Sequence, residues 1–160
     1  MSAPLLFTNL KSQDISGVQE FTNAHLDCSY PVGFFLQFLY TRGSLCLQLR
    51  SEQEPNKILG VISGKLVSLE DHKYDGHIYT LAVEPAARRL GLGSKLISEF
   101  EQKMRKESNG NLTFLSLDVR SRDQNALNFY KTQGFQFLDA NPIKNYYPND
   151  DAYKLVKPIL

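Results

Sequence analysis

The sequence predicts an α/β protein whose mixed sheet holds about seven strands, together with about four helices. Two strand-like segments, residues 45–49 and 58–69, flank a polar turn and predict an antiparallel hairpin. After them, strands and helices alternate along the chain, which is the pattern of a parallel strand pair. A chain of 160 residues with 42% hydrophobic residues has enough core for one domain, which we place at 1–160.

The first half of the chain predicts two helices between short strands. Ser12 or Asp14 is suited to cap a helix that ends near Leu26, because apolar residues recur there at helical spacing. Pro31 and Gly33 then interrupt regular structure before a second helix. The expected elements are a strand at 5–10, helices at 12–26 and 35–40, and the hairpin at 45–69.

The second half predicts strands that alternate with two helices. Leu92, Leu96, Phe100 and Met104 share the buried side of the first of these helices, and Gly110 is suited to its end. The expected strands are 77–83, 112–119, 135–138 and 152–159, and the expected helices are 90–106 and 123–133.

The composition argues against several classes of function. A formal net charge of +1 gives no electrostatic case for direct binding to nucleic acid or a membrane. Cys28 and Cys46 are too few and too isolated for a disulfide framework or a zinc site, so no metal is expected. No apolar run approaches the ~20 residues of a membrane span, and the first residues turn polar too soon for a signal peptide. We expect a cytoplasmic protein, with the nucleus as the alternative location.

The stretch from Arg88 to Gly93 gathers two arginines and two glycines at the start of a predicted helix. The first helix amides have no intrahelical acceptor and, with the helix dipole, attract anions. Gly91 and Gly93 let a ligand approach the backbone, while Arg88 and Arg89 add positive charge. A pyrophosphate fits such a loop. The spacing does not match a P-loop or a dinucleotide fingerprint, and a plain helix start with two solvated arginines stays the structural alternative.

The spacing Arg-x-x-Gly-x-Gly resembles the acyl-CoA loop of the GNAT acetyltransferases. A second GNAT signature resembles "RSRDQNALNFYKTQGF", in which Ala126, Tyr130, Gly134 and Phe135 fall at the expected spacing and Asp123 replaces the usual asparagine. The resemblance covers most of the chain and implies the GNAT fold, with acetyl-CoA as the cofactor. The implied coenzyme-binding residues are Leu81, Ala82, Val83, Arg88, Arg89, Leu90, Gly91, Leu92, Gly93, Ser94, Asp123, Asn125 and Tyr130.

Finer features resemble the protein N-terminal acetyltransferases, and among them the NatE catalytic subunit. "YPVGFF" resembles the segment between the first two helices of that family, and "IKNYYPNDDAY" resembles its tyrosine-bearing C-terminal hairpin. The resemblance implies acetylation of the free N-terminus of nascent or other peptides that begin with methionine and an apolar residue. It also implies association with the NatA catalytic and auxiliary subunits at the ribosome. The implied substrate-binding residues are Tyr30, Pro31, Val32, Phe34, Tyr79, Tyr146 and Tyr147.

The catalytic positions depart from the NatE pattern. That family places a tyrosine on the central strand and a histidine on the next parallel strand, where this sequence has His77 and Asp118. One interpretation makes His77 the general base, oriented by Asp118, because a reference pKa of ~6.5 suits proton removal near neutral pH. Tyr79 shares the strand face of His77 and is a second candidate, and the resemblance assigns the Tyr130 hydroxyl to the departing sulfur.

Two further interpretations stay open at this point. The chain could be a weakly active or inactive subunit that binds acetyl-CoA and modulates NatA, because the usual catalytic pair is replaced. It could also be a GNAT enzyme that acts on lysine side chains or on a small amine.

Overall fold

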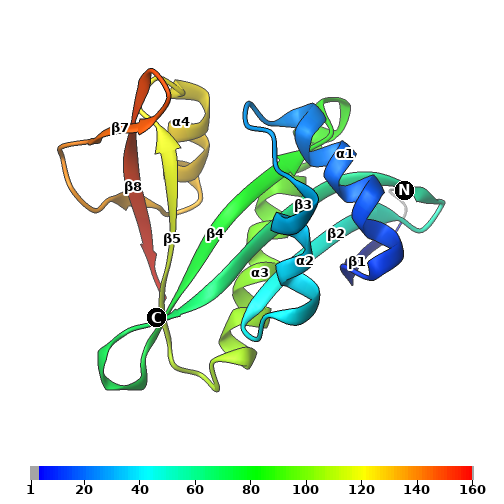
Figure 1. Ribbon diagram of the computed structural model, residues 1–160, viewed down its shortest axis with the longest axis horizontal. Coiled ribbons are helices and arrows are strands. Elements are labelled where there is room, and N and C mark those ends of the chain that lie inside the picture. Colours follow the sequence, from blue (N-terminus) through cyan, green and yellow to red (C-terminus); the bar gives the residue numbers. More distant parts are fainter. Residues whose placement is uncertain (1–3, 160) are drawn as a thin grey trace.

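The computed structural model describes residues 4–159, which form one sheet with helices on both faces (Figure 1). The strand order is β1-β2-β3-β4-β5-β8-β6, and β7 also pairs with β8. The strands are β1 (Leu5–Asn9), β2 (Ser44–Ser51), β3 (Glu54–Ser68), β4 (Tyr74–Val83), β5 (Leu112–Arg120), β6 (Gln136–Phe137), β7 (Ile143–Tyr147) and β8 (Asp150–Pro158). The α-helices are α1 (Ile15–His25), α2 (Val32–Tyr40), α3 (Leu92–Glu107) and α4 (Gln124–Thr132).

The parallel pair β4–β5, which the sequence predicts, holds together at one end only. The paired residues run from Tyr74 with Leu112 to His77 with Ser116. Beyond them the strands diverge into two arms, one carrying β1–β4 and the other β5, β7 and β8 (Figure 1). One edge of the outer half of β4 therefore has no strand partner, and this opening positions the site.

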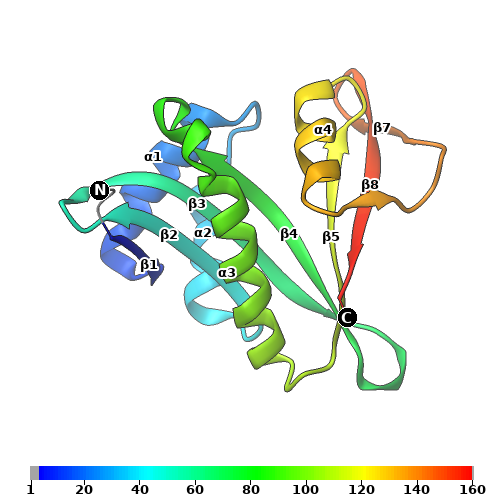
Figure 2. The ribbon, with the colours of Figure 1, turned by 180° about the vertical axis from the view of Figure 1, so that it is seen from behind.

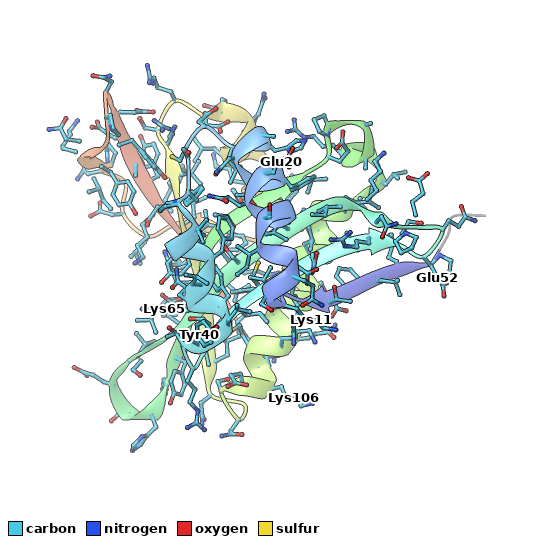
Figure 3. All side chains as sticks on the ribbon, turned by 45° about the vertical axis from the view of Figure 1, so that its right-hand side comes forward. Lys11, Glu20, Tyr40, Glu52, Lys65 and Lys106 are labelled. Atoms are coloured by element: carbon cyan, nitrogen blue, oxygen red, sulfur yellow. The ribbon has the colours of Figure 1, made fainter. Side chains whose placement is uncertain are left out.

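The helices divide between the two faces of the sheet. Helices α1 and α2 lie on one face, while α3 and α4 lie on the other (Figure 2). The larger core contains Leu96 and Phe100 of α3, both fully buried against the sheet, as the sequence predicts. A smaller core holds Val18 and Phe35 beneath α1 and α2. Tyr40, at the end of α2, projects outward instead and is 81% exposed (Figure 3).

Within residues 4–159 the sheet has eight strands, one more than predicted, because β7 is a separate strand hydrogen-bonded to β8. The hairpin of β7 and β8 itself agrees with the sequence prediction. β3 also begins earlier than predicted, at Glu54, because the chain pairs with β2 directly after its turn, from Ser51 with Glu54 onward. Both segments are mostly exposed, so they lack the buried alternation that reveals a strand.

Two helices start at positions other than those predicted. Helix α2 begins at Val32 rather than at 35, because Pro31 occupies its N-cap with extended backbone angles and Pro suits the start of a helix. Helix α3 begins at Leu92 rather than at 90, because residues 85–90 form a 3-10 helix that ends at Gly91. Within residues 4–159, no helix is long and apolar enough to span a bilayer.

Candidate active site

A cleft of about 520 Å³ opens where β4 and β5 diverge. Residues 79–83 of β4 line one side and residues 118–120 of β5 line the other. Residues 25–28, at and directly after the end of α1, and one face of α4 complete the walls, with Arg88 and Gly93 near the start of α3. A volume of this size suits a small molecule or cofactor.

Most of the predicted coenzyme-binding residues meet at this cleft. Those that line it are Leu81, Ala82, Val83, Arg88, Gly93, Asp123, Asn125 and Tyr130. Four others do not line it: Leu90 and Gly91 are exposed, Leu92 is buried in the core and Ser94 is half-buried. The side chain of Arg89 lies outside the described part of the chain.

The backbone of β4 offers hydrogen-bond groups to the cleft. The amide of Glu84 donates to the carbonyl of Leu59 in β3, with N and O 2.8 Å apart. Backbone groups point to alternate edges along a strand, so those of Val83 and Leu81 point away from β3, toward the open edge. Their amides are suited to donate to an acyl oxygen that gains negative charge.

The start of α3 fits a bound pyrophosphate. Gly91 caps the helix with a φ of 72°, in the left-handed region that glycine adopts without strain. The first amides of this 16-residue helix have no acceptor within the helix and can bind an anion. A Cβ at Gly93 would lie 2.9 Å from Cζ of Phe129, so glycine also lets α4 pack against α3.

Helix α4 presents a hydroxyl to the cleft. Asp123 caps the helix as the sequence predicts, since its Oδ1 accepts from the amide of Ala126 at 3.0 Å. Tyr130 lines the cleft and packs on Phe135, with ring centroids 5.6 Å apart. Burial raises the pKa of the Tyr130 hydroxyl above its usual value, and the nearby Asp123 carboxylate adds to this rise. The hydroxyl therefore stays protonated and can donate a hydrogen bond.

A β-bulge in β4 occurs at Tyr79. Thr80 pairs with Ser63 and Ile78 with Gly64, so Tyr79 is the extra residue between two ladder positions. Bulges next to active sites redirect a side chain. Here the bulge places Tyr79 at the cleft.

An aromatic wall forms around Tyr79, and it contains three of the predicted substrate residues, Tyr79 among them. Phe34 lies 5.8 Å from Tyr79 and 4.7 Å from Tyr30, measured between ring centroids. Tyr30 and Tyr79 line the cleft. Pro31 and Val32, predicted for the same wall, are exposed and do not line it. The wall is therefore built by rings rather than by the proline.

The loop between α1 and α2 contributes to the cleft in a way that the sequence interpretation missed. Asn23 fixes the loop by donating to the carbonyl of Tyr30 and by accepting from its amide, at 3.1 and 2.8 Å. Cys28 lines the cleft, and Nη2 of Arg120 donates to its Sγ at 3.7 Å. No sequence motif marks Cys28 or Arg120, because only the tertiary structure brings them together.

The two tyrosines of β7 meet β5 at Asp118. The Tyr146 hydroxyl donates to Oδ2 of Asp118 at 2.9 Å, and the Tyr147 hydroxyl donates to its backbone carbonyl at 3.4 Å. The Arg120 guanidinium lies 4.2 Å from the centre of the Tyr147 ring. Asp118 and Tyr147 line the cleft. Among the described residues, the buried Oδ1 of Asp118 has no hydrogen-bond partner, so it is free to accept from a ligand.

His77 lies next to Asp118, as the alignment of the two strands predicts. Its Nε2 is 3.9 Å from Oδ2 of Asp118, and its Nδ1 is 2.8 Å from Oγ of Ser116. The ring also contacts Tyr79, with centroids 5.4 Å apart. Burial lowers the pKa of His77 below its usual value, against the opposing effect of the Asp118 and Asp75 carboxylates. His77 is not among the described side chains that line the cleft, whereas Asp118 is.

Comparison with known proteins places this architecture in a family. The profile of the Acetyltransferase (GNAT) family matches residues 16–135. The chain belongs to the GNAT acetyltransferase family. Acetyl-CoA is the coenzyme of this family, and the glycines and helix amides at the start of α3, together with the open edge of β4, fit such a molecule.

Individual relatives are similar over most of their length. The N-alpha-acetyltransferase daf-31 of Caenorhabditis elegans is 29% identical over 150 residues, which is 92% of this chain and 80% of that protein. The N-terminal acetyltransferase B complex catalytic subunit naa20 of Schizosaccharomyces pombe is 28% identical over 147 residues, 87% of this chain and 78% of that protein. The crystal structure of Arabidopsis thaliana NAA60 with acetyl-CoA superposes with a TM-score of 0.82 at 16% identity, covering 98% of this chain and 99% of that one.

Proposed function

We propose that this protein transfers the acetyl group of acetyl-CoA to the free N-terminal amine of a peptide. The observation that carries the proposal is the position of Asp118 in the cleft wall. Its carboxylate accepts from Tyr146 and keeps one buried oxygen without a partner in the described structure. A carboxylate of this kind attracts the positively charged end of a peptide. The relatives named N-alpha-acetyltransferase and N-terminal acetyltransferase B catalytic subunit support the same activity.

The aromatic wall supports a substrate whose first side chain is apolar. The rings of Tyr30, Phe34 and Tyr79 contact one another in turn, while Tyr146 and Tyr147 on β7 donate hydrogen bonds to Asp118. Rings with a polar tip bind an apolar side chain and still donate to a peptide backbone. We therefore propose the NatE preference for methionine followed by an apolar residue, with NatA subunits as the partners and the cytoplasm as the location.

The chemistry assigns a task to each group. Bound acetyl-CoA supplies the thioester carbonyl carbon that the amine attacks. The backbone amides of Leu81 and Val83 donate to the carbonyl oxygen as it gains negative charge. Asp118 holds the terminal ammonium, and His77 takes one of its protons at Nε2 through Asp118 or a water, which leaves the neutral amine that attacks. The nitrogen loses a second proton as the amide forms, and this proton converts the departing thiolate into the thiol. As the carbon–sulfur bond breaks, the Tyr130 hydroxyl donates to the departing thiolate, and His77 later releases its proton to solvent.

A second candidate function is a non-catalytic subunit that binds acetyl-CoA and modulates NatA. One observation favours it: His77 does not line the cleft, and its Nε2 is 3.9 Å from Asp118, beyond hydrogen-bond distance. In this case the cleft binds the coenzyme, but no base reaches the amine.

One assay separates these functions. Purified protein is incubated with isotopically labelled acetyl-CoA and paired peptides that differ only in a free or a blocked N-terminus. Label on the free peptides alone supports N-terminal acetylation. Coenzyme binding without any product supports the non-catalytic subunit, and equal label on a blocked peptide that contains lysine supports a lysine acetyltransferase and overturns the proposal.

A further inference from the structure

A buried polar chain connects β4 and β5 at the point where the two strands separate. Oγ of Ser116 donates to Oδ2 of Asp75 at 2.7 Å, and the same Oγ lies 2.8 Å from Nδ1 of His77. Ser116 is fully buried and Asp75 is 5% exposed. Neither residue lines the cleft, so neither touches a ligand there. Burying a carboxylate costs free energy of folding unless the group is hydrogen-bonded or paired with a charge. The burial of Asp75 therefore indicates a role other than packing.

The direction of the hydrogen bonds defines the form of the imidazole. A serine hydroxyl has one proton, and Ser116 gives it to Asp75. Its Oγ can then only accept from His77, so the imidazole proton resides on Nδ1. In the neutral ring, Nε2 therefore carries the lone pair, on the side that faces Asp118.

We propose that Asp75 and Ser116 are positioning residues that hold neutral His77 in the Nδ1-protonated form, with Nε2 free to take a proton. The inference rests on the proposed function, in which His77 accepts the proton of the peptide amine. Without Ser116, the acceptor for Nδ1–H is lost. The proton would then move to Nε2, where the Asp118 carboxylate attracts it, and His77 could not act as a base.

Several charged and titratable groups surround His77, and they set the sign of each effect. Asp75 on β4 and Asp118 on β5 favour the protonated ring, whereas Lys154 on β8 and Lys65 on β3 disfavour it. Tyr146 on β7 contacts Asp118, and its pKa is raised to about 12, so it stays neutral in the relevant pH range. Replacing Asp75 by asparagine removes one carboxylate and should lower the pKa of His77.

The tautomer is measured directly, without any assay of activity. Nitrogen-15 NMR of the folded chain, well above the pKa of His77, distinguishes protonated from unprotonated ring nitrogens. We expect Nδ1 protonated and Nε2 unprotonated in the wild type, and a shift toward protonated Nε2 in Ser116→Ala. Ser63→Ala is the matched control, because Ser63 is an equally buried hydroxyl on β3 that pairs with Thr80 instead. A wild-type ring protonated at Nε2, or an unchanged ring in Ser116→Ala, would overturn the inference.

Kinetics then test whether the tautomer matters. Ser116→Ala should lower kcat about tenfold, the effect of one lost hydrogen bond, with KM unchanged, and Ser116→Thr should restore most of it. Asp75→Asn should move the acidic limb of the kcat/KM profile to lower pH. Equal losses in Ser116→Thr and Ser116→Ala, or an unmoved limb, contradict the inference. If the wild type forms no N-terminal product, the proposed function fails, whereas the NMR result still decides the tautomer.

Discussion

Replacing Asp118 by asparagine tests the assigned amine site most sharply. The substitution keeps an oxygen that accepts from Tyr146 and removes only the negative charge. Asp118 is 13% exposed, and its Oδ2 is 3.9 Å from Nε2 of His77. Two unit charges at about 4 Å interact by about 1 kcal/mol in water and about 4 kcal/mol at an effective dielectric constant of 20.

Asp118→Asn removes this attraction for the peptide ammonium and for protonated His77, so the energies predict how far kcat/KM falls. We expect kcat/KM for a free-N-terminus peptide to fall between about fivefold and about a thousandfold in Asp118→Asn. The pKa of His77 should also fall, because Asp118 favours its protonated form, so the acidic limb of the profile should move to lower pH. The assay is steady-state acetyl transfer measured from about pH 5 to about pH 9. This range covers the reference pKa of a histidine, ~6.5, and that of a peptide α-amine, about 7.7–8.0.

A matched control variant replaces another aspartate by asparagine at a position away from the cleft. Asp139, in the exposed loop before β7, accepts from the amide of Asn141, and asparagine can do the same. Asp139→Asn should leave kcat/KM unchanged. An Asp118→Asn variant that also keeps wild-type kcat/KM at every pH would refute the placement of the amine beside Asp118.

Two further predictions concern the coenzyme end of the cleft. Gly93→Ala should destabilise the fold by about 1–3 kcal/mol and weaken acetyl-CoA binding, because the new Cβ meets the Phe129 ring at 2.9 Å; thermal unfolding and calorimetry measure both. Gly33→Ala is its control and should not destabilise, since no atom lies within 4 Å of a Cβ there. Cys28 should react with a thiol reagent more slowly when acetyl-CoA is bound, whereas Cys46, 2% exposed and with its pKa raised to about 12, should react in neither state. An unaltered rate at Cys28 would place the coenzyme outside the cleft.

The sequence predicted those features of the fold that depend on residues close together in the chain, such as helix caps and the order of strands and helices. Leu92, Leu96, Phe100 and Met104 share the buried side of α3 as their spacing predicts, and Asp123 caps α4 through the amide of Ala126. The alternation of strands and helices predicted the parallel pair β4–β5. Each of these features depends on a few neighbouring residues, so a single sequence is enough to reveal it.

Features that depend on register between distant strands could not be predicted in this way. The bulge at Tyr79 is visible only in the pairing of β4 with β3. Likewise, Ser116 meets His77 because the strands pair in one particular register, 39 residues apart in the chain. The contact between Arg120 and Cys28 crosses 92 residues. No local pattern records such contacts, although they shape much of the candidate site.

A crystal structure with acetyl-CoA tests the central claim most directly. The account predicts the pyrophosphate on the amides at the start of α3, next to Gly91 and Gly93, and the thioester between the β4 edge at Leu81–Val83 and the Tyr130 hydroxyl. Density for the coenzyme anywhere other than the cleft between β4 and β5 would contradict it.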